Sequence, residues 1–292
     1  MKSNNSTDCP QDFSTAMKEA RKRKNGDKPP NMVHEMSILN ILLWLYMFEK
    51  SIAAILARVS KSSAGAIVKK LVTIGLIHQQ NTVTGGFELG VPKLLYTLTP
   101  AGLDYVQRHC DDSYRYRWAN NPSGLKQGKL YHDLIGQILT LRNLESGSIT
   151  SYTPESKYTE MNQLGKKRPD ILWHMRDGTT KALEVELTKK TGRDLDMLVF
   201  RIVESLTTPI AEDQIGSYLL VTDKPGIESS YRQAMQVGAP LTEWQKSKGN
   251  RWVRIEGNKR IPASIEGRFE TICQSDFFAQ LRIRKAGGKC HE

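Results

Sequence analysis

Three carboxylates stand among apolar residues in the stretch RPDILWHMRDGTTKALEVELTKK, residues 168–190. Asp170 begins one apolar run, and Glu184 and Glu186 lie inside the next. An isolated buried charge is costly unless a cation lies beside it, so a proton or a cation must compensate these acids. Oxygen ligands select hard ions, which makes Mg²⁺ or Mn²⁺ the expected metal. Such an ion would activate water against a phosphorus centre.

The two apolar runs flank an Asp-Gly turn, which predicts a hairpin. Alternation along the second strand sends Glu184 and Glu186 to one face. A two-residue loop would turn Asp170 to the wrong face. A three-residue loop at positions 177–179, or a bulge, pairs Asp170 with Glu186 and Leu172 with Glu184. We expect this second register, which joins the three acids in one site.

Composition narrows the classes of protein to consider. The chain has 292 residues with a formal charge of +11. Neither a long uncharged apolar window nor a signal-peptide core is present, so we expect a cytoplasmic protein without membrane insertion. The four cysteines form no C-x-x-C pair, which argues against a zinc knuckle and a disulfide framework. The excess of Lys and Arg indicates a polyanionic partner.

The N-terminal third is expected to bind DNA. Residues 1–31 predict a disordered basic arm, which is either a solubilising tail or a nucleic-acid contact. In residues 32–110, three short helices, two strands around a Gly-Gly turn, and a helix starting at Thr99-Pro100 predict a winged helix-turn-helix. The segment resembles winged-helix DNA-binding domains; a protein-docking module is the alternative. The resemblance and the basic outer face of the third helix together predict these DNA contacts: Lys61, Ser62, Ser63, Lys69, Lys70, Thr84 in the wing, and Arg168 ahead of the acidic stretch.

Residues 111–128 form the candidate linker. Tyr114 and Tyr116 alternate with arginines there, a combination that either stacks bases or tucks the linker onto a domain. Residues 129–292 form the second domain, in the order helix, strand, strand, strand, helix, strand, helix. After the last helix of this order, RWVRIEG predicts a strand and SDFFAQLRIRK a helix. These two elements either cap the sheet or add basic surface.

RPD followed fourteen residues later by EVE resembles the core of the PD-(D/E)xK nucleases. This resemblance implies that Asp170 and Glu184 hold the metal. Glu186 replaces the usual lysine, as in some restriction enzymes of that superfamily. The general base would then be Glu186, or Lys189 reaching in from the strand's end; the alternative for Lys189 is a phosphate-facing role.

The predicted winged helix, YHDLIGQILTL, and PESKY ahead of KKRPD are together similar to the replication-relaxation family, and especially to MobC-type plasmid mobilisation relaxases. The similarity spans roughly residues 35 to 210. It implies Glu155 as a further metal ligand and His132 as a residue that orients a ligand or contacts phosphate. The alternatives are a helix cap or a partner of Lys157 for Glu155, and an ordinary helix histidine for His132.

The expected fold class is therefore α/β (α+β): an N-terminal winged helix-turn-helix followed by a PD-(D/E)xK restriction-endonuclease-like mixed sheet. The expected function is a metal-dependent DNA nickase at a plasmid transfer origin in conjugative mobilisation, with a coupling protein of a type IV secretion system as a further partner. The alternatives are a DNA-binding replication or transcription regulator with an inactive nuclease-like domain, and a transposition endonuclease. No His-x-His pair or phosphate-binding loop occurs, which argues against a His-metal tyrosine relaxase and an ATP-driven motor.

Overall fold

The computed structural model describes residues 30–61, 64–82, 91–110, 116–158, 168–207, 215–255 and 257–279. Within these ranges the protein is a mixed α+β structure. No helix among them combines the length and apolarity needed to cross a bilayer. Several predictions fall outside the described residues: most of the basic arm, Ser62, Ser63, Thr84 with the Gly-Gly turn, Tyr114, and most of the C-terminal helix.

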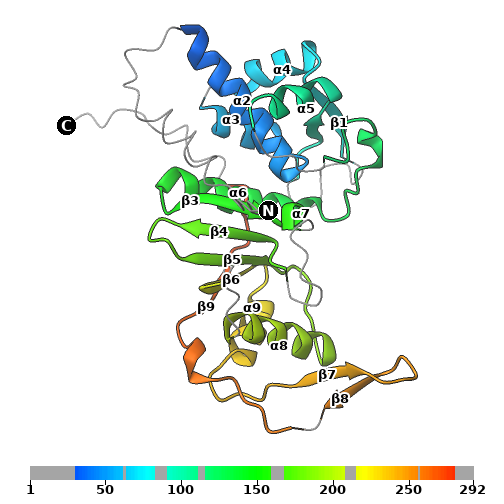
Figure 1. Cartoon of the computed structure of the whole chain (residues 1–292), viewed down its shortest axis with the longest axis vertical. Helices are drawn as coiled ribbons and strands as arrows, with labels where there is room; N and C mark the ends of the chain where they lie inside the picture. The colour runs from blue at the N-terminus through cyan, green and yellow to red at the C-terminus, as the bar shows by residue number, and fades with distance from the viewer. Residues whose placement is uncertain are drawn as a thin grey trace, which may run out of the picture.

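The N-terminal unit, residues 30–110, lies at one end of the molecule (Figure 1). Its elements in chain order are α2 (Pro30–Phe48), α3 (Ala53–Ser60), α4 (Ala64–Thr73), β1 (Ile77–Asn81), β2 (Leu94–Leu98) and α5 (Pro100–Gln107). Strands β1 and β2 pair antiparallel. This confirms the predicted order of three helices, two strands and a helix.

Local sequence explains how α5 begins. The Thr99 hydroxyl accepts a hydrogen bond from the Gly102 N–H at 3.1 Å, and Pro100 occupies the first turn, as predicted. A Cβ at Gly102 would lie 2.0 Å from the Leu76 carbonyl oxygen, so only glycine fits there. The TPAG segment therefore fixes both the start of α5 and its close approach to the residue before β1.

The sheet unit, residues 129–279, holds the remaining strands and helices. These are α6 (Leu130–Ser146), β3 (Ile149–Pro154), α7 (Glu155–Tyr158), β4 (Ile171–Met175), β5 (Thr180–Val185), α8 (Arg193–Thr207), β6 (Ser217–Thr222), α9 (Pro225–Ala234), β7 (Glu243–Lys246), β8 (Trp252–Ile255), the 3₁₀ turn η3 (Ala263–Ile265) and β9 (Phe269–Cys273). A further 3₁₀ turn, η2 (Pro122–Gly124), lies in the segment between the two units.

The central sheet has the strand order β3-β4-β5-β6-β9. Strands β3, β4 and β5 form an antiparallel meander, whereas β6 and β9 run parallel to β5. The helix and strand order predicted from α6 to α9 is confirmed, with the short α7 added. Strand β8 lies within the predicted RWVRIEG strand, while β7 and β9 were not predicted.

The predicted register of the β4–β5 hairpin is wrong. Leu172 pairs with Ala182 instead of Glu184. The loop comprises residues 176–178, because the Met175 N–H already donates to the Thr179 carbonyl and Gly178 takes a left-handed φ of 87°. A loop that begins one residue earlier shifts every pair by two and leaves the faces unchanged.

Two hydrophobic clusters cover the two faces of the sheet. One face packs on α6 and continues without interruption into the N-terminal unit, through residues such as Trp44 and Tyr152, whose rings lie 5.5 Å apart. The other face packs on α8 and α9. Figure 1 shows the resulting stack of N-terminal helices, α6 with the sheet, α8 with α9, and the β7–β8 hairpin at the far end.

Candidate functional site

Helix α4 presents a basic face to solvent. Ile67, Val68 and Leu71 are buried against the N-terminal core, while Lys69 and Lys70 are exposed on the other side. Lys61, which precedes the helix, is exposed as well. The apolar stripe therefore orients the helix as predicted, with Lys69 and Lys70 on its exposed side.

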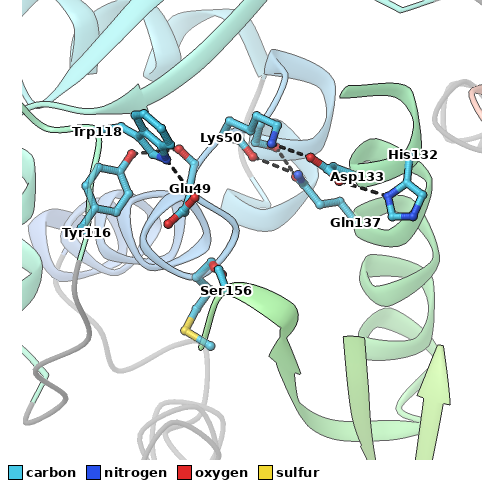
Figure 2. Close-up of polar contacts among 10 residues, drawn as sticks. Glu49, Lys50, Tyr116, Trp118, His132, Asp133, Gln137 and Ser156 are labelled. Atoms are coloured by element: carbon cyan, nitrogen blue, oxygen red, sulfur yellow. Dashed lines mark hydrogen bonds and ion pairs between the residues drawn. The ribbon is translucent and has the colours of Figure 1, made fainter. Parts of the chain in front are cut away.

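A charged junction joins the N-terminal unit to α6 and to the start of β4. Lys50 reaches the Asp133 carboxylate at 2.5 Å, and Asp133 lies 3.1 Å from Nδ1 of His132 (Figure 2). His132 Nε2 lies 3.2 Å from the Asp170 carboxylate, which also accepts the Val185 N–H at 2.8 Å. Cations and anions alternate along this chain of contacts, so His132 is one of the compensating cations for Asp170.

The protonation of His132 follows from these neighbours. Burial alone would lower the pKa of His132, but hydrogen bonds and charge from Asp133 and Asp170 raise it to about 10. Burial alone would raise the pKa of Asp133, but His132 and Lys50 hold it below its usual range. The imidazole is therefore a cation at neutral pH and donates from both nitrogens.

Gln137, a fully buried residue of α6, is the polar centre of the same junction. Its side-chain oxygen accepts from Trp44 Nε1 at 3.0 Å and from the Ser51 hydroxyl at 2.7 Å. Its amide donates to the Lys50 carbonyl at 2.9 Å (Figure 2). One side chain thus satisfies groups at several points of the N-terminal unit and fixes how that unit sits on α6.

The linker aromatics pack on the N-terminal unit. The Tyr116 hydroxyl donates to the Glu49 carbonyl at 2.8 Å and accepts the Leu98 N–H at 2.9 Å. Trp118 Nε1 donates to the Glu49 carboxylate at 2.8 Å (Figure 2). Burial raises the pKa of Tyr116. For Tyr116, the structure favours the alternative in which the linker packs onto a domain over the one in which it stacks on bases.

Glu184 and Glu186 are buried on the sheet face that α8 and α9 cover, at 6% and 8% exposure. Glu186 pairs with Lys190, accepts the Thr188 N–H at 3.3 Å and accepts the Tyr231 hydroxyl at 3.2 Å. Burial and the charge of Glu184 raise the pKa of Tyr231, which keeps its hydroxyl a donor. Lys190 is therefore the compensating cation for Glu186, while Lys189 is exposed.

A cleft of about 300 Å³ opens at the junction. Its charged lining residues are Glu49, Lys50, Arg117, Lys129, His132, Asp133, Glu155 and Asp170. Glu155 is exposed at the start of α7, and its N–H donates to the Asp170 carbonyl at 2.8 Å. Arg168 is half-buried two residues before Asp170. The structure thus brings Glu155, His132 and Asp170 to one cleft.

The other two acids do not line this cleft. Asp170 contacts His132 on the α6 side of the sheet, whereas Glu186 contacts Tyr231 of α9 on the opposite side. Among the described residues, no group of three or more His, Cys, Asp or Glu side chains has an arrangement that would hold a metal ion. As they are arranged here, Asp170 and Glu186 do not contact one common site.

Lys190, Lys50 and Asp133 were not predicted from the sequence as members of these ion pairs. Lys190 follows Glu186 by four residues, but it lies beyond the end of β5, so the strand pattern gave no reason to choose it over Lys189. Lys50 and Asp133 are far apart in the chain and meet only because the N-terminal unit packs on α6. Asp133 stands next to His132, and that adjacency was an available signal.

Comparison with models of known protein families gives no match, and comparison with curated proteins gives none either.

Proposed function

We propose that this chain binds duplex DNA through the exposed face of α4. The observation that carries the proposal is that α4 turns Lys69 and Lys70 to solvent while its apolar side is buried. The surrounding order of three helices, a two-stranded antiparallel sheet and a helix is the one expected of a winged helix-turn-helix, in which the third helix enters the major groove. The formal charge of +11 supports a polyanionic partner.

The test is the double variant Lys69→Ala with Lys70→Ala, measured by fluorescence anisotropy on a labelled duplex. Each lost phosphate contact lowers the salt slope by about 0.9, which corresponds to about fivefold in affinity at about 0.15 M salt. Two contacts therefore predict a loss of about 25-fold. The matched control is Arg176→Ala with Arg201→Ala, two exposed arginines of the sheet unit. Equal affinities and slopes for both variants would show that α4 does not face DNA.

A metal-dependent nickase is the second candidate. One observation favours it: the Asp170 carboxylate accepts the N–H of Val185, the residue between Glu184 and Glu186. The sheet around these acids is mixed, which is compatible with a PD-(D/E)xK-like domain. The donor arrangement does not fit a shared Mg²⁺ or Mn²⁺, so we assign no catalytic step to Asp170, Glu184, Glu186 or Lys189. The alternative function, a DNA-binding regulator with an inactive nuclease-like domain, needs no metal site and is therefore compatible with this arrangement of the acids.

Supercoiled plasmid incubated with Mn²⁺, with and without chelator, separates the two candidates. A nickase gives chelator-sensitive relaxation that Asp170→Ala and Glu184→Ala abolish and the exposed control Asp194→Ala keeps. Plasmids that carry transfer origins are the first substrates, because the sequence resemblance points to mobilisation relaxases. Binding without any metal-dependent relaxation would assign the chain to the regulators. Strand cleavage at transposon ends alone would favour a transposition endonuclease.

A further inference from the structure

The β7–β8 hairpin projects from the end of the molecule opposite the N-terminal unit (Figure 1). Its strands pair antiparallel from Glu243 opposite Ile255 to Lys246 opposite Trp252. A tight turn closes it, with the Ser247 N–H donating to the Arg251 carbonyl at 2.8 Å and Asn250 in the left-handed region at a φ of 59°. The turn chemistry therefore defines one fixed ribbon and not a loose loop.

Two tryptophans tie this ribbon to α8. Trp244 Nε1, near the open end of the hairpin, donates to the Asp196 carboxylate of α8 at 3.0 Å, and the Arg193 guanidinium of α8 lies 5.6 Å from the ring centre of Trp252, which flanks the turn. Residues 245–251 and 253–255 are exposed, with Val253 at 48% and Ile255 at 37%. A two-stranded hairpin buries too little apolar surface to be stable alone, so its contacts with α8 must stabilise it.

Charge is concentrated on this ribbon. Residues 243–260 carry six basic and two acidic residues, so about a third of the net charge of the chain sits in a short segment. Lys259 is paired with Glu243 at 2.6 Å. Over the described ranges of the chain, Lys248, Arg251 and Arg254 have no acidic partner, and all three are exposed. Like charges held together without counter-charge repel one another and attract a polyanion.

We propose that the β7–β8 hairpin is a second DNA-binding element, which contacts the phosphate backbone through Lys248, Arg251 and Arg254. A two-stranded ribbon is narrow enough for the major groove of B-DNA, and basic side chains near its turn reach the flanking phosphates. The proposal rests on the DNA binding proposed for α4. It adds a contact at the other end of the molecule, so one duplex that touches both elements must run along the sheet unit.

Edge protection is the ordinary explanation for exposed Lys and Arg on short strands. Edge protection accounts for charges along a strand. It does not account for the cations in the turn, Lys248 and Arg251, or for a hairpin that projects from the rest of the molecule. An acidic protein and an anionic membrane would both be attracted by the same charge. DNA is the occupant that also accounts for the basic face of α4.

The test compares Arg251→Glu with Arg176→Glu. Both arginines are exposed and stand beside the turn of a β-hairpin, and both changes alter the charge by the same amount. Binding is measured on a duplex of about 40 base pairs, roughly 135 Å long, and on one of about 12 base pairs, roughly 40 Å, because B-DNA rises about 3.4 Å per base pair. Arg251→Glu should weaken the long duplex by at least about fivefold, lower its salt slope by about 0.9, and leave the short duplex nearly unchanged.

The outcomes separate this proposal from the previous one. If wild type binds both duplexes, the α4 variant weakens both, and Arg251→Glu behaves as Arg176→Glu on both, the hairpin proposal is wrong and DNA binding by α4 stands. If wild type binds neither duplex, both proposals are wrong. Arg251-dependent binding to anionic vesicles, with unchanged binding to the long duplex, would assign the hairpin to a membrane surface instead.

Discussion

The charged junction and the β7–β8 hairpin use charge in opposite ways. At the junction, Lys50, Asp133, His132 and Asp170 alternate in sign and lie within hydrogen-bonding distance of one another. On the hairpin, cations gather at an exposed tip. Removing one member of a paired set leaves its partner uncompensated, whereas removing one member of a like-charged set relieves repulsion. Junction variants should therefore act on stability, and hairpin variants on binding.

The largest expected effect comes from Asp133→Ala. It leaves the Lys50 ammonium and the His132 imidazolium near each other without the shared anion, and breaking such a pair costs roughly 3 kcal/mol. Urea unfolding followed by circular dichroism measures the loss. The control is Asp104→Ala, which removes an exposed ion pair with Arg108 and should cost at most about 0.5 kcal/mol. Equal losses of stability in the two variants would mean that the junction ion pairs contribute no more to folding than an exposed surface pair does.

The pH dependence of stability sharpens the same contrast. The pKa of His132 is raised to about 10 from an ordinary value near 6.5. Its contribution to the free energy of unfolding is therefore complete below about pH 6.5 and is lost as pH rises through about 10. Wild type should lose stability across that window, and His132→Gln should show a flatter profile. Parallel profiles for the two proteins would contradict the assignment.

A smaller effect is expected at the base of the hairpin. Trp244→Phe keeps an aromatic ring but removes the hydrogen bond to Asp196, which contributes about 1 kcal/mol. Since the ribbon has little core of its own, the loss should appear as faster amide exchange in residues 243–255 and not as a large fall in the global melting temperature. Unchanged exchange would show that the hydrogen bond does not hold the ribbon.

The smallest effect on stability is expected for Arg251→Glu. Its side chain is exposed and lies among like charges, so the free energy of unfolding should stay within about 0.5 kcal/mol of wild type or rise slightly. Thermal unfolding checks this value. A loss comparable to that of Asp133→Ala would show that the hairpin tip is part of the architecture.

Local patterns in the sequence predicted much of the fold. The TPAG segment defined the start of α5, and the alternation in ALEVEL placed Glu184 and Glu186 on one face. The register could not be predicted as reliably, because a loop that begins one residue earlier obeys the same turn preferences. Strands β7 and β9 were missed because FETIC and EWQK are short and lack a strong apolar alternation.

The candidate site, like the fold, was predicted only in part. Asp170, His132 and Glu155 were all named from the sequence, and they line one cleft. Asp170 precedes β4, which begins at Ile171, so strand alternation does not fix the direction of its side chain, and no local pattern predicts its contact with His132. His132 beside Asp170 and Lys190 beside Glu186 show that protein cations can compensate acids for which a metal is the simpler expectation.

The hydrophobic cluster shared by the N-terminal unit and the sheet has a consequence for folding. Trp44 and Phe48 pack against Tyr152, and Ile41 and Leu134 belong to the same cluster. Either half expressed alone would expose one side of that contact to water and would be prone to aggregate. The whole chain should instead unfold in a single cooperative calorimetric transition. Helix α4 would then be carried on a rigid body, and DNA bound to it would be held at one angle to the sheet.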